Sequence, residues 1–269
     1  MTKKLLLIIF LSLFSAAIFA STSSVTPSTQ AQKNNEINLL VSKYHFKRAE
    51  INNLFAQAKK DPKVIACMTK PAEKGSWKSY QNFFVTQARI DNGATYWHEH
   101  RAALARMQKK YGVTPGIAVA IIGVETAYGT HIGKYPVFNT LYTLAFYYPK
   151  QAHFFQQELA LYLVLARNNH LPITTLKGSY AGAVGIPQFM PSSYLHYGVP
   201  GGDYKTVNLF TNNNDAIASI GNYLKLAGFK KNHFKAILAY NHSTSYATVV
   251  TELSKAIKKQ YQHEYATRS

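Results

Sequence analysis

The stretch from Thr114 to Thr126, TPGIAVAIIGVET, decides the fold. Thr114 suits a helix N-cap and Pro115 suits the first helical position, so a helix is expected to begin here. Its middle, GIAVAIIGV, is apolar on nearly every face, which is typical of a helix buried at the centre of a domain. Glu125 is the exception, because it places a carboxyl group near the C-terminal end of this apolar helix.

Helical spacing of apolar residues continues on both sides of this segment. Upstream, positions 39–40 and 51–55 indicate small helices, Pro62 opens another, and a turn follows at 70–76. A strongly amphipathic helix is expected at 92–110, ended by Gly112. Further helices are expected downstream, at 137–147, 151–168, 215–227, 234–240 and 246–259. Strand patterns are weak, so the fold is expected to be mainly α with few or no strands.

One long segment interrupts the helical pattern. Residues 177–194, KGSYAGAVGIPQFMPSSY, combine several glycines with two prolines. Because long loops are uncommon in compact helical domains, a glycine-rich loop of this length is often part of a functional site.

The chain is strongly basic. It carries 30 Lys and Arg residues against 12 Asp and Glu residues, a formal net charge of +18. This excess favours an anionic partner, but charge alone does not choose among nucleic acid, an acidic polymer and a membrane surface. Cys67 is the only cysteine, which excludes an internal disulfide and a cysteine metal cluster, and no cysteine is placed to take a lipid anchor.

The N-terminus predicts export. Residues 1–20 have a short basic start, an apolar core and a small-residue end, as expected for a signal peptide cleaved near Ala20. Residues 21–35 are polar and without helical spacing, so they are expected to form a disordered linker before a folded domain at 36–269. We therefore expect a soluble periplasmic protein, which keeps its excess of positive charge after cleavage.

Glu125 stands apart from the other carboxylates in the sequence. Asp91 and Asp215 stand where helices are expected to start and suit helix caps, and most of the others lie in polar or amphipathic contexts. Burial and the negative end of the helix dipole should both raise the pKa of Glu125, which suits a general acid for glycosidic cleavage. A structural glutamate bonded to a neighbouring loop is an equal alternative from position alone.

The motifs resemble those of one enzyme family. GVETAYGTHIG is similar to the catalytic signature of the lytic murein transglycosylase B family. The likeness continues in the family's order through FNTLYTLAFYYP, LKGSYAGAVGIPQFMPSSY, DAIASIGNYL and AYNHSTSYA, and it covers roughly residues 77–250. It implies a lysozyme-like helical domain.

The resemblance also implies a reaction. Members cleave the β-1,4 bond between N-acetylmuramic acid and N-acetylglucosamine in peptidoglycan and leave a 1,6-anhydromuramic end. Glu125 matches the single acid/base of that reaction, in which the substrate's N-acetyl group assists and its 6-hydroxyl closes the ring. Among the carboxylates, none has a context comparable to that of Glu125, which favours substrate assistance over a second catalytic carboxylate.

Six further positions match family residues that line the sugar sites or orient the acid. They are Tyr80, Ser179, Gln188, Tyr223, Tyr240 and Asn241. A tyrosine ring can cover a sugar face while its hydroxyl reaches a polar partner. From spacing alone each tyrosine is more often a core residue, and only the motif match reverses that preference.

Two departures from the family limit what the resemblance carries over. Some members have a calcium-binding loop after the QFMPSSY segment, whereas here Asp203 and Asp215 are the only charged oxygen donors, too few for a confident calcium site. No metal or cofactor is therefore expected, and calcium is doubtful. An inserted subdomain of other members is also missing before Tyr240, which predicts a compact form with a more open cleft.

Three alternatives stay open on the residues alone. A hydrolytic muramidase would deliver water in place of the 6-hydroxyl, and an inactive scaffold would keep the fold and only bind glycan. Nucleic-acid binding is disfavoured by the export signal and by the lack of a recognised binding motif. The expected partners are peptidoglycan glycan strands, and the sequence does not identify which wall-synthesis proteins contact the enzyme.

Overall fold

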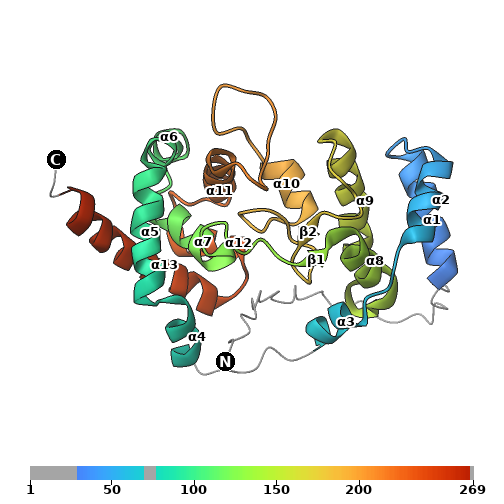
Figure 1. The fold of residues 1–269 in the computed structure, drawn as a ribbon, viewed down its shortest axis with the longest axis horizontal. Coiled ribbons are helices and arrows are strands. Elements are labelled where there is room, and N and C mark those ends of the chain that lie inside the picture. The colour runs from blue at the N-terminus through green and yellow to red at the C-terminus, as the bar shows by residue number, and fades with distance from the viewer. Residues whose placement is uncertain (1–28, 70–76, 267–269) are drawn as a thin grey trace.

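The computed structural model describes residues 29–69 and 77–266. The expected signal peptide, the start of the expected linker and the expected turn at 70–76 lie outside these residues. Within them the fold is mainly α-helical, as predicted, and the only sheet of the described part has two strands. Figure 1 shows helices gathered in two groups, with the short strands and α10 (Pro191–Tyr197) between them.

The remaining elements follow in chain order. Those up to Glu125 are α1 (Thr29–Ser42), α2 (Arg48–Gln57), α3 (Pro62–Thr69), α4 (Trp77–Phe84), α5 (Gln87–Glu99), α6 (Arg101–Tyr111) and α7 (Pro115–Thr126). The helices after it are α8 (Val137–Tyr147), α9 (Ala152–Asn168), α11 (Asn213–Leu226), α12 (His233–Tyr240) and α13 (Thr244–Tyr261). Shorter elements are β1 (Tyr135–Pro136), η1 (Pro149–Gln151), β2 (Lys177–Gly178) and η2 (Gln262–Ala266).

Two hydrophobic cores hold these helices. One is built by α5, α6, α7, α11, α12 and α13, and the other by α1, α2, α3, α8 and α9. The antiparallel pair β1–β2 joins the end of the first group to the glycine-rich loop, with Tyr135 opposite Gly178. Tyr223 and Tyr240 pack against both cores, so the region around these two side chains is the junction of the two halves.

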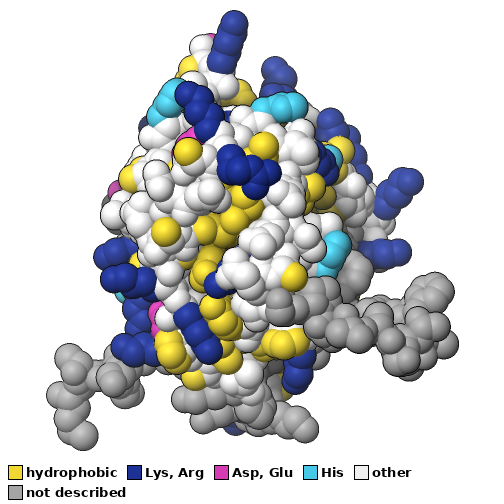
Figure 2. Space-filling model, turned by 90° about the vertical axis from the view of Figure 1, so that its right-hand side faces the viewer, with side chains coloured by type: hydrophobic (Ala, Val, Ile, Leu, Met, Phe, Trp, Pro, Cys, Tyr) yellow, Lys and Arg dark blue, Asp and Glu magenta, His cyan; other side chains and the backbone are white. Residues whose placement is uncertain are grey.

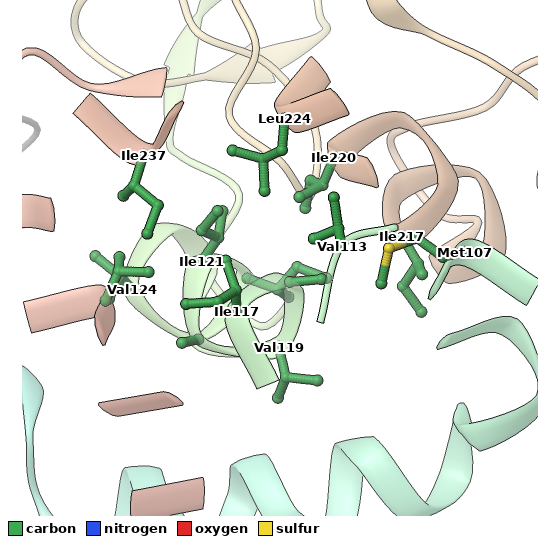
Figure 3. Close-up of a cluster of buried hydrophobic side chains, with 14 of the residues drawn as sticks. Met107, Val113, Ile117, Val119, Ile121, Val124, Ile217, Ile220, Leu224 and Ile237 are labelled. Atoms are coloured by element: carbon green, nitrogen blue, oxygen red, sulfur yellow. The ribbon is translucent and has the colours of Figure 1, made fainter. Parts of the chain in front are cut away.

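Helix α7 is the central element, as its sequence predicts. Every residue from Gly116 to Thr126 is buried, and the helix packs against α5, α6, α11 and α13. Figure 3 shows Ile121 and Val124 of α7 among side chains of α6, α11 and α12. A helix that buries its whole circumference fixes the position of its C-terminal residues, which include Glu125.

The helix expected at 92–110 is in fact two helices. Helix α5 ends at Glu99 and α6 begins at Arg101, with His100 at φ −106° and ψ 19° between them. Both parts contact α7, but α5 also packs along α13 whereas α6 packs along α11, so the chain must turn between these two partners. The cap expected at Asp91 is also wrong, because α5 begins earlier and the Thr86 side chain accepts from the backbone N–H of Arg89 at 3.2 Å.

The linker expected at 21–35 is too long. Helix α1 already begins at Thr29, within the polar segment. Lys33 shows why, because its Nζ donates to the Tyr147 hydroxyl at 3.1 Å and lies 5.0 Å from the centre of the Tyr142 ring. These contacts come from α8, over a hundred residues away, and no local pattern reveals them.

Positively charged side chains are scattered over the face of the molecule in Figure 2. On the face in Figure 2, Lys and Arg side chains project around the molecule and few Asp and Glu side chains are visible. Apolar side chains gather in a band through the middle of the same face. Of the helices among the described residues, none has the length and apolar character needed to cross a membrane.

Candidate active site

Glu125 lies near the C-terminal end of α7 and is 7% exposed. Burial raises the pKa of this carboxyl group to about 7, because an apolar surrounding disfavours the ionised form. The Tyr246 hydroxyl donates to Glu125 Oε1 at 2.7 Å and opposes this shift, since the bond stabilises the carboxylate. The pKa of Glu125 therefore lies near neutral pH, where the carboxyl group can both donate and accept a proton.

The turn after Glu125 is unusual. Three consecutive residues have positive φ: Ala127 at 47°, Tyr128 at 63° and Gly129 at 84°. The first two carry a Cβ, so each costs on the order of 1–2 kcal/mol in this conformation. Thr126 compensates, because its hydroxyl donates to the Ile186 carbonyl at 3.1 Å and accepts from the Gly129 N–H at 3.0 Å. The end of α7 is thereby fastened to the glycine-rich loop.

Three tyrosines surround the carboxyl group. The rings of Tyr240 and Tyr246 are 6.4 Å apart and nearly parallel, and the Tyr240 hydroxyl donates to the Pro187 carbonyl at 2.6 Å. Burial, and after it the nearby Glu125 charge, raises the pKa of Tyr80, Tyr240 and Tyr246. These phenols therefore stay protonated, and those of Tyr240 and Tyr246 donate hydrogen bonds.

Two amide oxygens near Tyr240 are buried and unused. Gln188 follows Pro187, and its Nε2 donates to the carbonyls of Gly185 at 2.8 Å and Ile132 at 3.1 Å. This leaves Gln188 Oε1 without a donor among the described residues, and the same is true of Asn241 Oδ1. Buried acceptors are nearly always satisfied, so these two oxygens are exceptions within the described residues.

The other predicted substrate residues have different positions. Tyr223 donates to the Ala239 carbonyl at 2.6 Å, and its ring lies 4.9 Å from that of Tyr240. Ser179 is buried, but its hydroxyl oxygen accepts from the backbone N–H groups of Ala181 and Ala183. The structure therefore links Tyr80, Tyr240 and Tyr246 to Glu125, while Ser179 first of all shapes its own loop.

Three carboxylates that the sequence places in polar, amphipathic or helix-start contexts turn out to be buried. They are Glu36, Glu158 and Asp215. Burial raises the pKa of Glu36 to about 7, whereas Glu158 binds both the backbone N–H and the hydroxyl of Ser192 at the start of α10. Glu36 lies on α1 and Glu158 on α9, and each helix buries one carboxylate along with the apolar side of an amphipathic segment. The sequence alone does not show which polar residue of such a segment will be covered. Both helices belong to the second core rather than to the core of α7.

Asp215 is occupied by the protein itself. Its carboxylate accepts from the backbone N–H of Gly201 at 2.8 Å, from the backbone N–H of Asn208 at 2.7 Å and from the Tyr204 hydroxyl. It does not cap α11, where the Asn212 side chain takes that place. Within the described ranges, 29–69 and 77–266, no three His, Cys, Asp or Glu side chains are grouped to hold a metal ion.

Tyr246 is the site residue that the sequence did not single out. It lies within the AYNHSTSYA motif, six positions after Tyr240, at the start of α13. Its spacing alone resembles that of a core residue. Only the fold, which packs α13 directly along α7, brings its hydroxyl to Glu125.

Comparison with known proteins identifies relatives of the chain. Residues 29–233 match the family described as Transglycosylase SLT domain. Over 213 residues, 76% of this chain, the sequence is 38% identical to membrane-bound lytic murein transglycosylase B of Escherichia coli strain K12. The match spans 59% of the length of that relative.

Two solved structures share the fold. Soluble lytic transglycosylase SltB1 from Pseudomonas aeruginosa has a TM-score of 0.82 at 30% identity, over 85% of this chain and 99% of that chain. The Escherichia coli lytic transglycosylase SLT35, solved in complex with bulgecin A and also with calcium, has a TM-score of 0.80 at 31% identity, over 86% of this chain and 93% of that chain. These likenesses confirm the predicted lysozyme-like fold. The chain therefore belongs to the transglycosylase SLT domain family.

Proposed function

We propose that the protein is a lytic transglycosylase that cleaves the β-1,4 bond between N-acetylmuramic acid and N-acetylglucosamine in peptidoglycan. The observation that carries this proposal is Glu125, a buried carboxyl group with a pKa of about 7 held by Tyr246. Membership of the family and the relatives' printed activity support the same reading. We also propose that the reaction takes place in the periplasm, on the basis of the signal peptide expected at residues 1–20.

The proposed reaction uses one carboxyl group twice. Protonated Glu125 donates its proton to the glycosidic oxygen as the bond from that oxygen to C1 breaks. The substrate's N-acetyl group stabilises the positive charge at C1. Glu125, now a carboxylate, takes the proton of the 6-hydroxyl as this oxygen bonds to C1, which gives the 1,6-anhydro product without net consumption of water or protons.

The surrounding residues suit this cycle. Tyr246 occupies Oε1 of Glu125 and leaves the other carboxyl oxygen for the substrate. Gln188 and Asn241 lie beside Tyr240, and their buried amide oxygens lack donors within the described residues. The phenols of Tyr80 and Tyr240 stay neutral, and their rings suit the face of a sugar. Tyr223 braces Tyr240, and Ser179 holds the loop that carries Gln188.

Mass spectrometry of digested sacculi tests the proposal. We expect muropeptides that end in 1,6-anhydromuramic acid, and reducing-end muramic acid as the main product would instead indicate a hydrolytic muramidase. Wild-type protein that binds sacculi and releases no product would indicate a scaffold.

The substitution Glu125→Gln tests the role of the carboxyl group. We expect turnover to fall by about 10²–10⁴-fold or more, because a general acid contributes this much, while glycan binding is kept. Glu36→Gln is the matched control, since it removes another buried carboxyl group with a pKa of about 7 that lies on α1. A Glu125→Gln protein as active as wild type would exclude Glu125 as the acid.

A further inference from the structure

A cluster of lysines lies where three segments meet, opposite the site end of α7. The Tyr111 ring, at the end of α6, has Lys110 Nζ 5.2 Å and Lys225 Nζ 5.9 Å from its centre. The Lys230 side chain lies over Gly112, so closely that a Cβ at Gly112 would be 2.5 Å from Lys230 Cε. Lys231 and Lys235 are exposed close by in the chain. We call these five lysines the basic edge: Lys110, Lys225, Lys230, Lys231 and Lys235.

Two large apolar side chains are exposed within the basic edge. Leu226 is 60% exposed, the largest value among the exposed large hydrophobic residues of the described chain, and Phe234 is 38% exposed. Every residue from 230 to 235 is exposed. The segment is nevertheless well anchored, because Phe229 beside it is fully buried and stacks on His233 with ring centres 4.1 Å apart. Leu226 and Phe234 are therefore exposed on an ordered turn that the buried Phe229 holds in place.

The segments of sequence that carry the basic edge contain no acidic residues. No Asp or Glu occurs between positions 100 and 124 or between positions 216 and 251. Lysines at the C-terminal ends of α6 and α11 favour those helices, since that end of the helix dipole is negative. Lys230 lies over Gly112, the C-cap of α6, so it too favours that helix end. Lys231 and Lys235 flank the start of α12, where the dipole is positive, and there they oppose it. Helix stability therefore does not account for Lys231 and Lys235.

We propose that the basic edge docks the protein on an anionic phospholipid bilayer. Lysine ammonium groups attract anionic headgroups, and each one near the surface strengthens binding by about fivefold. Leu226 and Phe234 are placed to enter the boundary between headgroups and acyl chains. An acidic wall polymer would use the lysines but offers nothing apolar for these two side chains, which is why we assign the surface to lipid.

Docking at this edge leaves the site around Glu125 free. Helices α7 and α12 both start beside the edge and end in the site, at Glu125 and Tyr240. At a rise of about 1.5 Å per residue, their 12 and 8 residues place the site roughly 12–18 Å from the edge. The bilayer would thus hold the site at a fixed height above its surface.

Vesicle co-sedimentation of the mature protein tests the proposal. We expect binding to vesicles of phosphatidylglycerol and phosphatidylethanolamine, and little binding to phosphatidylcholine vesicles. The triple variant Lys230→Gln, Lys231→Gln, Lys235→Gln should bind the anionic vesicles about 100-fold more weakly. The matched control removes three exposed lysines of α13, Lys255, Lys258 and Lys259, and should bind within about threefold of wild type.

Further variants separate the contribution of the apolar side chains from that of the lysines, and vesicle binding from catalysis. Replacing Leu226 and Phe234 by Ser should weaken binding by at least about tenfold in high salt, where lysine attraction is screened. The edge triple should change the melting temperature little, because losing Lys231 and Lys235 favours the start of α12 while losing Lys230 removes a favourable charge from the end of α6. Glu125→Gln should bind vesicles as wild type does, so that failure of the proposed function and failure of docking are told apart.

Three results would overturn the proposal. Equal losses in the two lysine triples would show that only net charge matters. Unchanged binding after loss of Leu226 and Phe234 would remove the apolar contact. An edge triple that still binds vesicles but no longer binds purified sacculi would assign the basic edge to the wall polymer.

Discussion

The hydrogen bond from Tyr246 lowers the pKa of Glu125 and so opposes the larger effect of burial. Because the bond stabilises the carboxylate, Tyr246→Phe should raise the pKa of Glu125 above its value of about 7. The acid form then persists to higher pH, so the alkaline limb of kcat/KM should move up by about one pH unit. We also expect kcat to fall by about tenfold, since the carboxyl group loses its fixed orientation.

The control for this prediction is Tyr162→Phe. Tyr162 is fully buried and donates to the Ile173 carbonyl at 2.6 Å, so its substitution removes a similar bond in the second core. It should lower stability and leave the pH profile of turnover in place. If Tyr246→Phe also leaves the profile in place, Tyr246 is structural and does not tune the acid.

Glu36 carries a cost in stability that depends on pH. Burial raises the pKa of Glu36 from 4.5 to about 7, so between these values the folded protein keeps a proton that the unfolded chain has lost. Stability therefore falls as pH rises from about 4.5 to 7 and the penalty stays above pH 7. Glu36→Gln removes the ionisable group and should raise the free energy of unfolding by up to about 3 kcal/mol at pH 8.

Thermal unfolding at two pH values checks this expectation. The gain of Glu36→Gln over wild type should be small at pH 5 and larger at pH 8. Glu50→Gln, on the exposed side of α2, is the control and should give the same small difference at both. A gain of equal size at pH 5 and pH 8 would show that Glu36 is not protonated in the folded protein.

At the scale of elements, Gly133 allows the strand pair to reach the glycine-rich loop. Its φ is +108°, and an added Cβ would lie 2.1 Å from the carbonyl carbon and oxygen of Gly178. Gly133→Ala should therefore destabilise the protein by at least about 3 kcal/mol, combining strain with a backbone clash. Calorimetry should show a fall in melting temperature of roughly 6–12 °C.

Gly228→Ala is the matched control for this prediction. Gly228 has a similar φ of +85°, but no atom lies within 4 Å of an added Cβ. It should cost only the conformational strain, about 1–2 kcal/mol. Equal losses in the two variants would mean that contact with Gly178 contributes nothing to stability.

Elements with a strong local pattern could be predicted from the sequence. Helix α8 has the expected bounds, and α9, α11, α12 and α13 differ by two residues or fewer at each end, because their apolar faces and caps lie in the local sequence. The predicted helix ends were wrong where contacts with residues far away in the sequence set the end of the helix. The break at His100 depends on which partners α5 and α6 meet, and the early start of α1 depends on the α8 tyrosines around Lys33.

At the scale of the whole molecule, the site could be predicted only in part. Glu125 and the raised pKa of its carboxyl group follow from one apolar helix, so they could be read locally. Tyr246 could not, because its role requires α13 to pack along α7. The buried carboxylates Glu36 and Glu158 were missed for the same reason, since a residue in an amphipathic segment becomes buried only when a neighbour covers it.

The segment 198–212 gives a last prediction, which concerns calcium. The related SLT35 was solved in complex with calcium, but here the Asp215 carboxylate already accepts from Gly201, Tyr204 and Asn208. The residues present therefore do not fit a calcium site, and the carboxylate organises this segment directly. Neither calcium nor EDTA should change the melting temperature by more than about 1 °C.

Asp215→Asn should instead lower stability with or without calcium. The amide replaces one acceptor oxygen by a donor that faces backbone N–H groups, so we expect a loss of about 2–4 kcal/mol, or roughly 5–15 °C in melting temperature. Asp203→Asn is the control, because Asp203 is exposed in the same segment and should change little. A calcium-dependent rise of several degrees in wild type that disappears in Asp215→Asn would show that Asp215 binds the ion and that its bonds to the chain open to admit it.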